Sequence, residues 1–250
     1  MAVKIHETAQ VSLKNPVIVE GFPGLGLVGT ISASYLVEKL KMEPVGYITS
    51  DQFPPLAAVH NYQPLYPARI YASRKHNLIV LVSEFIVPLP AIYDLSDAIW
   101  DFAHAKKASK LISLGGIALK GEEGKVFAIA SHSKDVAELE RHHLISLIKE
   151  GATTGVTGVL LTRGSVENYP VISLLSPARG NYMDPKAAAV ILEVLKSYLH
   201  LQFDTAELEK ESQLIEGKMK DILEKGKASH NHYQKTVEEH ASTNLGSMYG

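Results

Sequence analysis

Three glycines near the N-terminus have the spacing of a phosphate-binding turn. Gly24, Gly26 and Gly29 follow a short apolar segment and precede a helical pattern. In G-x-G-x-x-G loops with this context, free N–H groups at the helix N-terminus hold the pyrophosphate of a dinucleotide. Asp51 lies 22 residues after Gly29, close to where such folds place the acidic residue that binds a ribose. One hypothesis is therefore a nucleotide-binding enzyme that uses these four residues.

Two features of the same region favour a structural role for the glycines. Pro23 removes one N–H group from the loop, and residues 53–67 contain four prolines where a dinucleotide fold would continue with another strand–helix–strand crossover. A tight strand-to-helix turn, in which glycines permit close packing, explains the pattern equally well. Both interpretations remain open, and we favour the structural one.

Catalytic and metal-binding patterns are absent elsewhere. The sequence has no G-x-S-x-G elbow, no H-E-x-x-H helix and no P-loop, and it contains no cysteine. The adjacent His142 and His143 would point about 100° apart on a helix and would chelate a metal poorly. Glu84, Asp94 and Asp97 are candidates to line a cleft, but no nucleophile pairs with them. We expect no catalytic residue, metal or cofactor.

The C-terminal residues Met248, Tyr249 and Gly250 form a candidate partner-binding motif. A terminal carboxylate is a fixed negative charge that a lysine or backbone N–H groups of a receptor can bind. The tyrosine adds a large ring and a hydroxyl, and the methionine adds an adaptable apolar contact. A chain end of this kind suits insertion into a pocket on another protein.

The elements that position these residues alternate between strands and helices. Strands are predicted at 16–20, 44–49, 68–73, 78–83, 110–114, 126–130 and 170–176, and helices at 27–41, 91–107, 134–142 and 186–201. Asp184 before Pro185 is the N-cap signature of the last helix. The first strand–helix–strand unit predicts parallel pairing between 16–20 and 44–49. The fold class is α/β, with a mostly parallel mixed sheet flanked by helices.

The composition divides the chain into three parts. Residues 1–203 form the α/β core domain. From Asp204 onward 15 of 47 residues are charged, against 37 of 203 before it, and Leu208, Ile215 and Ile222 fall seven apart. This spacing predicts an amphipathic helix over 204–225. Residues 226–250 hold few large apolar side chains, so we expect a disordered tail.

Charge and hydropathy exclude several classes of protein. The 250 residues carry a net charge of −2, with 46% apolar and 21% charged residues. This balance is typical of a globular protein and argues against a nucleic-acid binder, which shows a basic excess. No run of about 18 apolar residues predicts a membrane span, and no signal peptide opens the sequence. We therefore expect a cytoplasmic protein.

Gly21-Phe22-Pro23-Gly24-Leu25-Gly26-Leu27-Val28-Gly29 after Val17-Ile18-Val19-Glu20 resembles the signature of the proteasome assembly chaperone 2 family. Gly115-Gly116 and the glycine-rich segment 151–158 add to the resemblance, which covers about residues 10–200. It implies a phosphorylase/hydrolase-like sandwich and, for archaeal members, a homo-oligomeric, non-enzymatic chaperone or activator-like adaptor of the 20S proteasome. It also implies that tails ending in a hydrophobic residue, tyrosine and any residue dock into pockets of the α ring. That motif maps onto Met248, Tyr249 and Gly250. A scaffold whose tail is incidental remains a third hypothesis.

Overall fold

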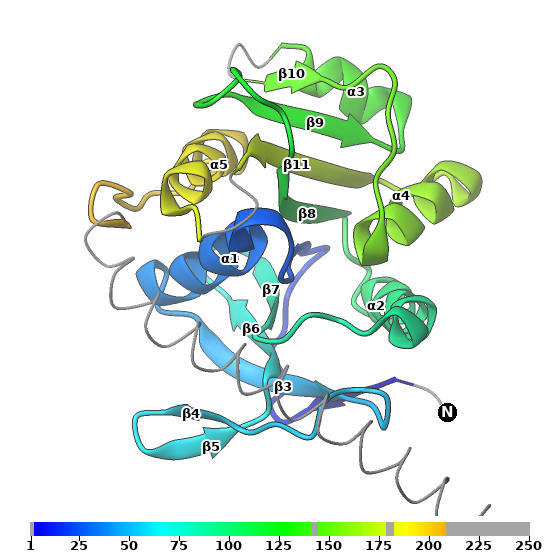
Figure 1. Ribbon diagram of the computed structural model, residues 1–250. Coiled ribbons are helices and arrows are strands. Elements are labelled where there is room, and N and C mark those ends of the chain that lie inside the picture. Colours follow the sequence, from blue (N-terminus) through cyan, green and yellow to red (C-terminus); the bar gives the residue numbers. More distant parts are fainter. Residues whose placement is uncertain (1–2, 142–144, 179–182, 209–250) are drawn as a thin grey trace, which may run out of the picture.

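The computed structural model describes residues 3–141, 145–178 and 183–208. Within these ranges one mixed sheet has the strand order β1-β3-β6-β7-β2-β8-β11-β9-β10, and a separate hairpin, β4–β5, lies beyond one end of it (Figure 1). The strands are β1 Lys4–Glu7, β2 Val17–Gly21, β3 Glu43–Thr49, β4 Ala58–His60, β5 Gln63–Leu65, β6 Ala68–Ser73, β7 Leu78–Ser83, β8 Lys110–Ile117, β9 Val126–Ala130, β10 Ile145–Leu147 and β11 Val171–Pro177.

The centre of the sheet is parallel, and its flanks are largely antiparallel. Strands β7, β2, β8 and β11 run in the same direction, whereas β6 pairs antiparallel with β7 and β9 pairs antiparallel with β11. The central strands are almost continuously apolar because helices cover both of their faces. This arrangement confirms the predicted α/β class with a mixed sheet flanked by helices.

Helices cover both faces of the sheet (Figure 1). Helix α1 (Val28–Lys39) and helix α5 (Pro185–Tyr198) lie on one face, and helix α2 (Ile92–Ala105) and helix α4 (Gly155–Glu167) lie on the other. Helix α3 (Ser133–Leu139) packs beside β9 and β10. Two short 3₁₀ turns, η1 (Leu25–Leu27) and η2 (Leu89–Ala91), lead directly into α1 and α2.

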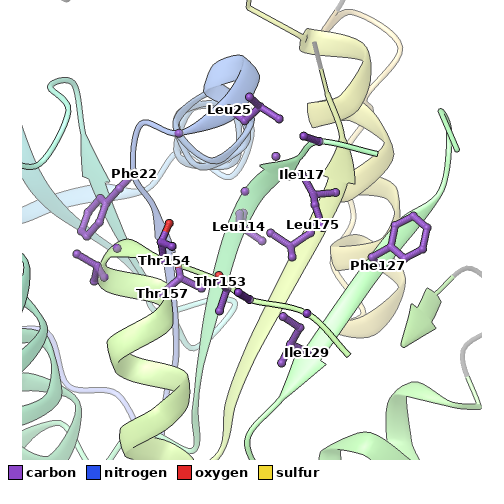
Figure 2. A pocket seen from close by; sticks show the side chains of 18 of the residues that line it. Phe22, Leu25, Leu114, Ile117, Phe127, Ile129, Thr153, Thr154, Thr157 and Leu175 are labelled. Carbon is purple, nitrogen blue, oxygen red and sulfur yellow. The ribbon is translucent and has the colours of Figure 1, made fainter. Parts of the chain in front are cut away.

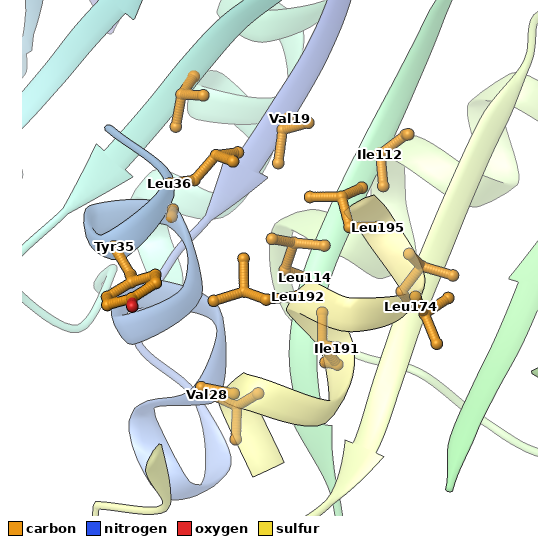
Figure 3. Packing of buried hydrophobic residues seen from close by; sticks show 14 of the residues in the cluster. Val19, Val28, Tyr35, Leu36, Ile112, Leu114, Leu174, Ile191, Leu192 and Leu195 are labelled. Carbon is orange, nitrogen blue, oxygen red and sulfur yellow. The ribbon is translucent and has the colours of Figure 1, made fainter. Parts of the chain in front are cut away.

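The alternation of side chains along each strand separates two hydrophobic cores. On β2, Val19 faces α1 and α5, whereas Ile18 faces α2 and α4. Figure 3 shows the first core, in which sheet residues meet helix residues that include Leu36, Leu192 and Leu195. Residues 204–208 extend this core, because Leu208 is buried and the Tyr35 hydroxyl donates to the Asp204 carbonyl at 2.8 Å.

The predicted parallel pairing of the first two strands is wrong. Strand β3 runs in the same direction as β2, but β7 and β6 lie between them. The six residues of β7 are all buried and need a central place, whereas β3 is half-exposed and suits a position near the edge. The hairpin β6–β7 therefore occupies the position next to β2, and β3 pairs antiparallel with β6 and β1.

Most of the other local predictions agree with the structure. The Asp184 side chain accepts a hydrogen bond from the Ala187 amide at 3.0 Å, which confirms the predicted N-cap of α5. The glycine-rich segment 151–158 ends in the first turn of α4, which begins at Gly155. The predicted helix over 204–225 lies outside the described residues after Leu208, and the predicted tail over 226–250 lies outside them entirely.

Candidate functional site

The glycine turn between β2 and α1 is built for close packing. A Cβ atom on Gly29 would lie less than 3.0 Å from the backbone oxygen of Leu114 on β8, and one on Gly21 would lie equally close to the Gly29 oxygen. Gly26 has a φ of 63°, in the left-handed region that favours glycine. These contacts bring α1 directly onto the sheet, so close packing accounts for Gly26 and Gly29 without a ligand.

Asp51 lies far from this turn. It follows β3, which β6 and β7 separate from β2. Three strand spacings of about 4.8 Å make this separation roughly 15 Å. The nucleotide-binding hypothesis required the two strands to be neighbours, so the structure does not bring Asp51 together with Gly24, Gly26 and Gly29. Gly24 borders the cavity described below, and a Cβ atom there would meet nothing within 4 Å.

A cavity of about 1080 Å³ opens at the carboxyl ends of β2, β8 and β11, between the glycine turn and the N-terminus of α4 (Figure 2). This edge of a parallel sheet is where α/β folds generally bind ligands. The walls are mainly apolar and include Phe22, Leu25, Ile117, Phe127, Ile129 and Leu175. The polar side chains of the lining are those of Glu20, Lys149, Glu150, Thr153, Thr154 and Thr157. This cavity is the candidate functional site.

Glu20 lies at the floor of the cavity and is 2% exposed. Its side chain points toward α4, where the Thr157 hydroxyl donates to the carboxylate oxygen Oε1 at 3.1 Å. Ser113, its register partner on β8, also donates to Oε1, and the Ser113 and Thr157 hydroxyls lie 2.5 Å apart. Three elements distant in the sequence thus build one polar cluster beneath the α4 N-terminus.

Burial raises the pKa of Glu20 from its ordinary value of 4.5 to about 7. The hydroxyls of Ser113 and Thr157 and the Phe22 backbone N–H favour the ionised form, but they offset the desolvation only in part. The carboxyl therefore exchanges its proton near neutral pH. Chemically, such a group can bind a cation, share a hydrogen bond or transfer a proton, and perturbed groups of this kind gather at functional sites.

Sequence reasoning did not single out Glu20, because it follows an apolar run and belongs to no catalytic or metal-binding motif. Its partners Ser113 and Thr157 lie 93 and 137 residues away. One signal was present, since a charged residue inside a strand that is apolar and buried on both faces needs a specific partner. That signal indicates that Glu20 has a specific partner, but it does not indicate which elements supply the partner.

A second buried carboxylate, Glu84, directly follows β7 and has a structural role. Glu84 accepts from Arg69 Nη2 at 2.7 Å and lies 2.9 Å from His60 Nε2 on β4. Burial opposes ionisation of Glu84, but the hydrogen bonds from His60 and Arg69 outweigh it and hold the pKa of the carboxyl below its ordinary value. Glu84 does not line the cavity described above, and its buried ion pair ties the β4–β5 hairpin to the sheet.

The predicted C-terminal motif and the two adjacent histidines fall outside the described ranges. Met248, Tyr249 and Gly250 belong to the undescribed segment 209–250, and His142 and His143 to the gap at 142–144. Among the residues that are described, no group of three or more His, Asp or Glu side chains is placed to hold a metal ion. None of the helices in the same residues has the length and apolar character to cross a membrane.

Comparison with known proteins shows that most of the chain is similar to archaeal relatives. A protein from Methanocaldococcus jannaschii, named only as uncharacterised, is 31% identical over 223 residues, which are 89% of this chain and 92% of the relative. The crystal structure of Pyrococcus furiosus PbaA, an archaeal homologue of proteasome-assembly chaperone, is similar with a TM-score of 0.80 and 29% identity, covering 91% of this chain and 99% of PbaA. Pyrococcus furiosus PbaB, an archaeal proteasome activator, shares the fold with a TM-score of 0.74 at 23% identity, over 88% of this chain and 98% of PbaB.

The family model described as the PAC2 family matches residues 18–223. The match begins on β2, includes the glycine turn and the cavity, and extends past the last described residue. It agrees with the resemblance seen in the glycine segment, and the similarity to PbaA covers 91% of this chain. The chain therefore belongs to the PAC2 family.

Proposed function

We propose that this chain is a non-enzymatic, homo-oligomeric adaptor that binds the 20S proteasome as an assembly chaperone or activator. In this proposal Met248, Tyr249 and Gly250 dock into pockets of the proteasome α ring. The observation that carries the proposal is the similarity to PbaA, an archaeal homologue of proteasome-assembly chaperone, over 91% of this chain at 29% identity. The PAC2 family match over residues 18–223 supports it independently.

The C-terminal sequence supplies the contact. With Gly250 as the last residue, its carboxylate provides the charge that a pocket lysine would pair with, and Tyr249 provides a ring and a hydroxyl for the pocket wall. Several tails on one oligomer would engage several equivalent pockets of a ring at once. Binding that is weak for one tail then becomes strong through effective concentration.

The experiment is a pull-down of purified 20S particles and of free α subunits by the full-length protein. We expect that deleting residues 248–250, or the substitution Tyr249→Ala, abolishes retention of the proteasome while the oligomer keeps its size in light scattering. Asn244→Ala, in the same segment but outside the motif, is the matched control and should bind like the wild type. A second control adds one residue after Gly250, which moves the carboxylate and should weaken binding.

Each outcome of the pull-down bears on a different part of the proposal. Retention of 20S particles by the truncated protein at the wild-type level would refute the tail mechanism but leave a body-mediated interaction. Failure of the wild type to retain either particles or α subunits would refute proteasome binding altogether. Retention of α subunits alone identifies an assembly chaperone, whereas retention of complete particles identifies an activator-like adaptor.

A further inference from the structure

A row of polar side chains lies buried beneath α4, where an apolar interface would be more stable, and it begins with Glu20 at the floor of the cavity. Glu20, Ser113 and Ser173 are register partners on three adjacent strands, β2, β8 and β11, and all three are buried beneath α4. The Ser173 hydroxyl has no hydrogen-bond partner within the described part of the chain. Burying unpaired polar groups costs stability, so such a row calls for a functional explanation.

The buried carboxyl of Glu20 has no cationic partner among the described residues. Both hydroxyls that contact it donate to the same oxygen, Oε1, which favours the ionised form. No described Lys, Arg or His forms an ion pair with this carboxyl. An ionised carboxylate in a site with apolar walls therefore lacks the counter-charge that buried acids in proteins generally have.

The basic side chains on β8 and α4 are paired with groups other than Glu20. Lys110 on β8 points to the opposite face of the sheet, where it binds Asp135 at 3.1 Å and the Tyr198 hydroxyl at 2.6 Å. Arg163 on α4 binds Asp97 at 2.6 Å. The charged residues of the cavity lining other than Glu20 are Lys149 and Glu150, which are exposed on the segment that leads into α4.

We propose that this cavity binds a small organic cation, a primary amine on an apolar body, with its ammonium group on Glu20. The Glu20 carboxylate supplies the counter-charge, and the Thr157 hydroxyl, which also lines the cavity, supplies a further oxygen acceptor for the N–H donors of an ammonium group. The apolar body lies against the wall that includes Ile129 and Leu175 (Figure 2). This site is distinct from the C-terminal motif, so amine binding and proteasome binding are tested separately.

The first test compares probes of one size and different head groups. n-Hexylamine, hexanol and hexanoate are titrated into the full-length protein at pH 8 by isothermal titration calorimetry. We expect hexylamine to bind at least ten times more tightly than either of the other two. Equal binding of hexylamine and hexanol would show an apolar cavity without an amine site, and tighter binding of hexanoate would show an anion site at the α4 N-terminus. Either result overturns the proposal.

The second test removes the charge without changing the shape of the side chain. Glu20→Gln should weaken hexylamine binding at least tenfold and leave hexanol binding unchanged. Glu150→Gln removes an exposed carboxylate from the edge of the same cavity and should bind hexylamine like the wild type. Unchanged hexylamine affinity in the Glu20→Gln protein contradicts the proposed contact.

A third measurement uses the wild-type protein alone and so does not depend on the folding of a variant. Because Glu20 must lose its proton before it pairs with an ammonium group, hexylamine affinity should fall about tenfold from pH 8 to pH 6. Titrations at pH 6 in two buffers of different ionisation enthalpy should show the release of nearly one proton per bound amine. Pure amine binding without proton release, or an affinity independent of pH, overturns the assignment of Glu20.

Discussion

Replacing Glu20 by glutamine should change the pH dependence of stability in a definite direction. Burial raises the pKa of Glu20 in the folded protein to about 7 from its ordinary value of 4.5. The folded state therefore holds this proton more tightly than the unfolded state, and the wild type loses stability as the pH rises from about 4.5 to about 7. Glutamine keeps the shape of the side chain and one oxygen acceptor, but it does not titrate.

The size of the effect follows from the two pKa values. Each pKa unit of difference between the folded and unfolded states corresponds to about 1.4 kcal/mol. Integrated between pH 5 and pH 8, the difference at Glu20 gives a change of roughly 2–3 kcal/mol in the free energy of unfolding. As the pH rises from 5 to 8, the free energy of unfolding of the Glu20→Gln protein should therefore increase by this amount relative to that of the wild type. Contributions from the other titrating groups cancel in the comparison.

Urea unfolding at pH 5, 6, 7 and 8, followed by the fluorescence of Trp100, measures the effect. Trp100 is the single tryptophan of the chain and is 2% exposed, so its emission reports on the core beneath α2. The exposed Glu150→Gln variant is the matched control and should show no such trend. A stability difference between Glu20→Gln and the wild type that stays constant within about 0.5 kcal/mol from pH 5 to pH 8 would refute the reasoning.

Three further substitutions test the packing of the turn, the buried ion pair and the helix cap. Gly29→Ala should lower the free energy of unfolding by about 2 kcal/mol or more in urea titrations, because its Cβ atom meets a backbone oxygen of β8, whereas Gly24→Ala should be nearly neutral. Arg69→Ala should cost about 3–5 kcal/mol at pH 8 by leaving Glu84 buried, and less at pH 4, where Glu84 gains a proton; an equal loss at both pH values contradicts this explanation. Asp184→Ala should cost about 1 kcal/mol in thermal or urea unfolding, and Asp184→Asn should restore most of it because asparagine also caps helices.

The elements that the sequence alone predicted depend on local signals. The β-branched run of β2, the helical period of α1 and α2, the β6–β7 hairpin and the Asp184 cap of α5 all appear in the structure close to the predicted positions. Side-chain period, turn residues and caps act over a few residues, so they are visible in one sequence. The glycine segment also carried the family resemblance for the same reason, because its residues are contiguous.

Strand order was not visible in the same way. The first strand–helix–strand unit predicted neighbours, but the fully buried β7 and its partner β6 lie between β2 and β3. Which strand occupies the centre depends on the competition among all strands for burial on both faces. That competition involves residues dozens of positions apart. Its outcome places β6 and β7 between β3 and β2, so Asp51 lies far from the glycine turn.

The amino-acid sequence by itself was enough to predict the α/β class, to suggest a packing role for the glycine turn and to identify the Met248-Tyr249-Gly250 motif. Each of these features depends on consecutive or regularly spaced residues. Only the tertiary structure decided where a ligand site lies. The cavity exists because β2, β8 and β11 end side by side beneath α4, and Glu20 becomes a titrating group near neutral pH because that assembly removes it from water. The loss of water around a side chain depends on which distant residues surround it after folding, so the raised pKa of Glu20 cannot be predicted from the order of residues along the chain.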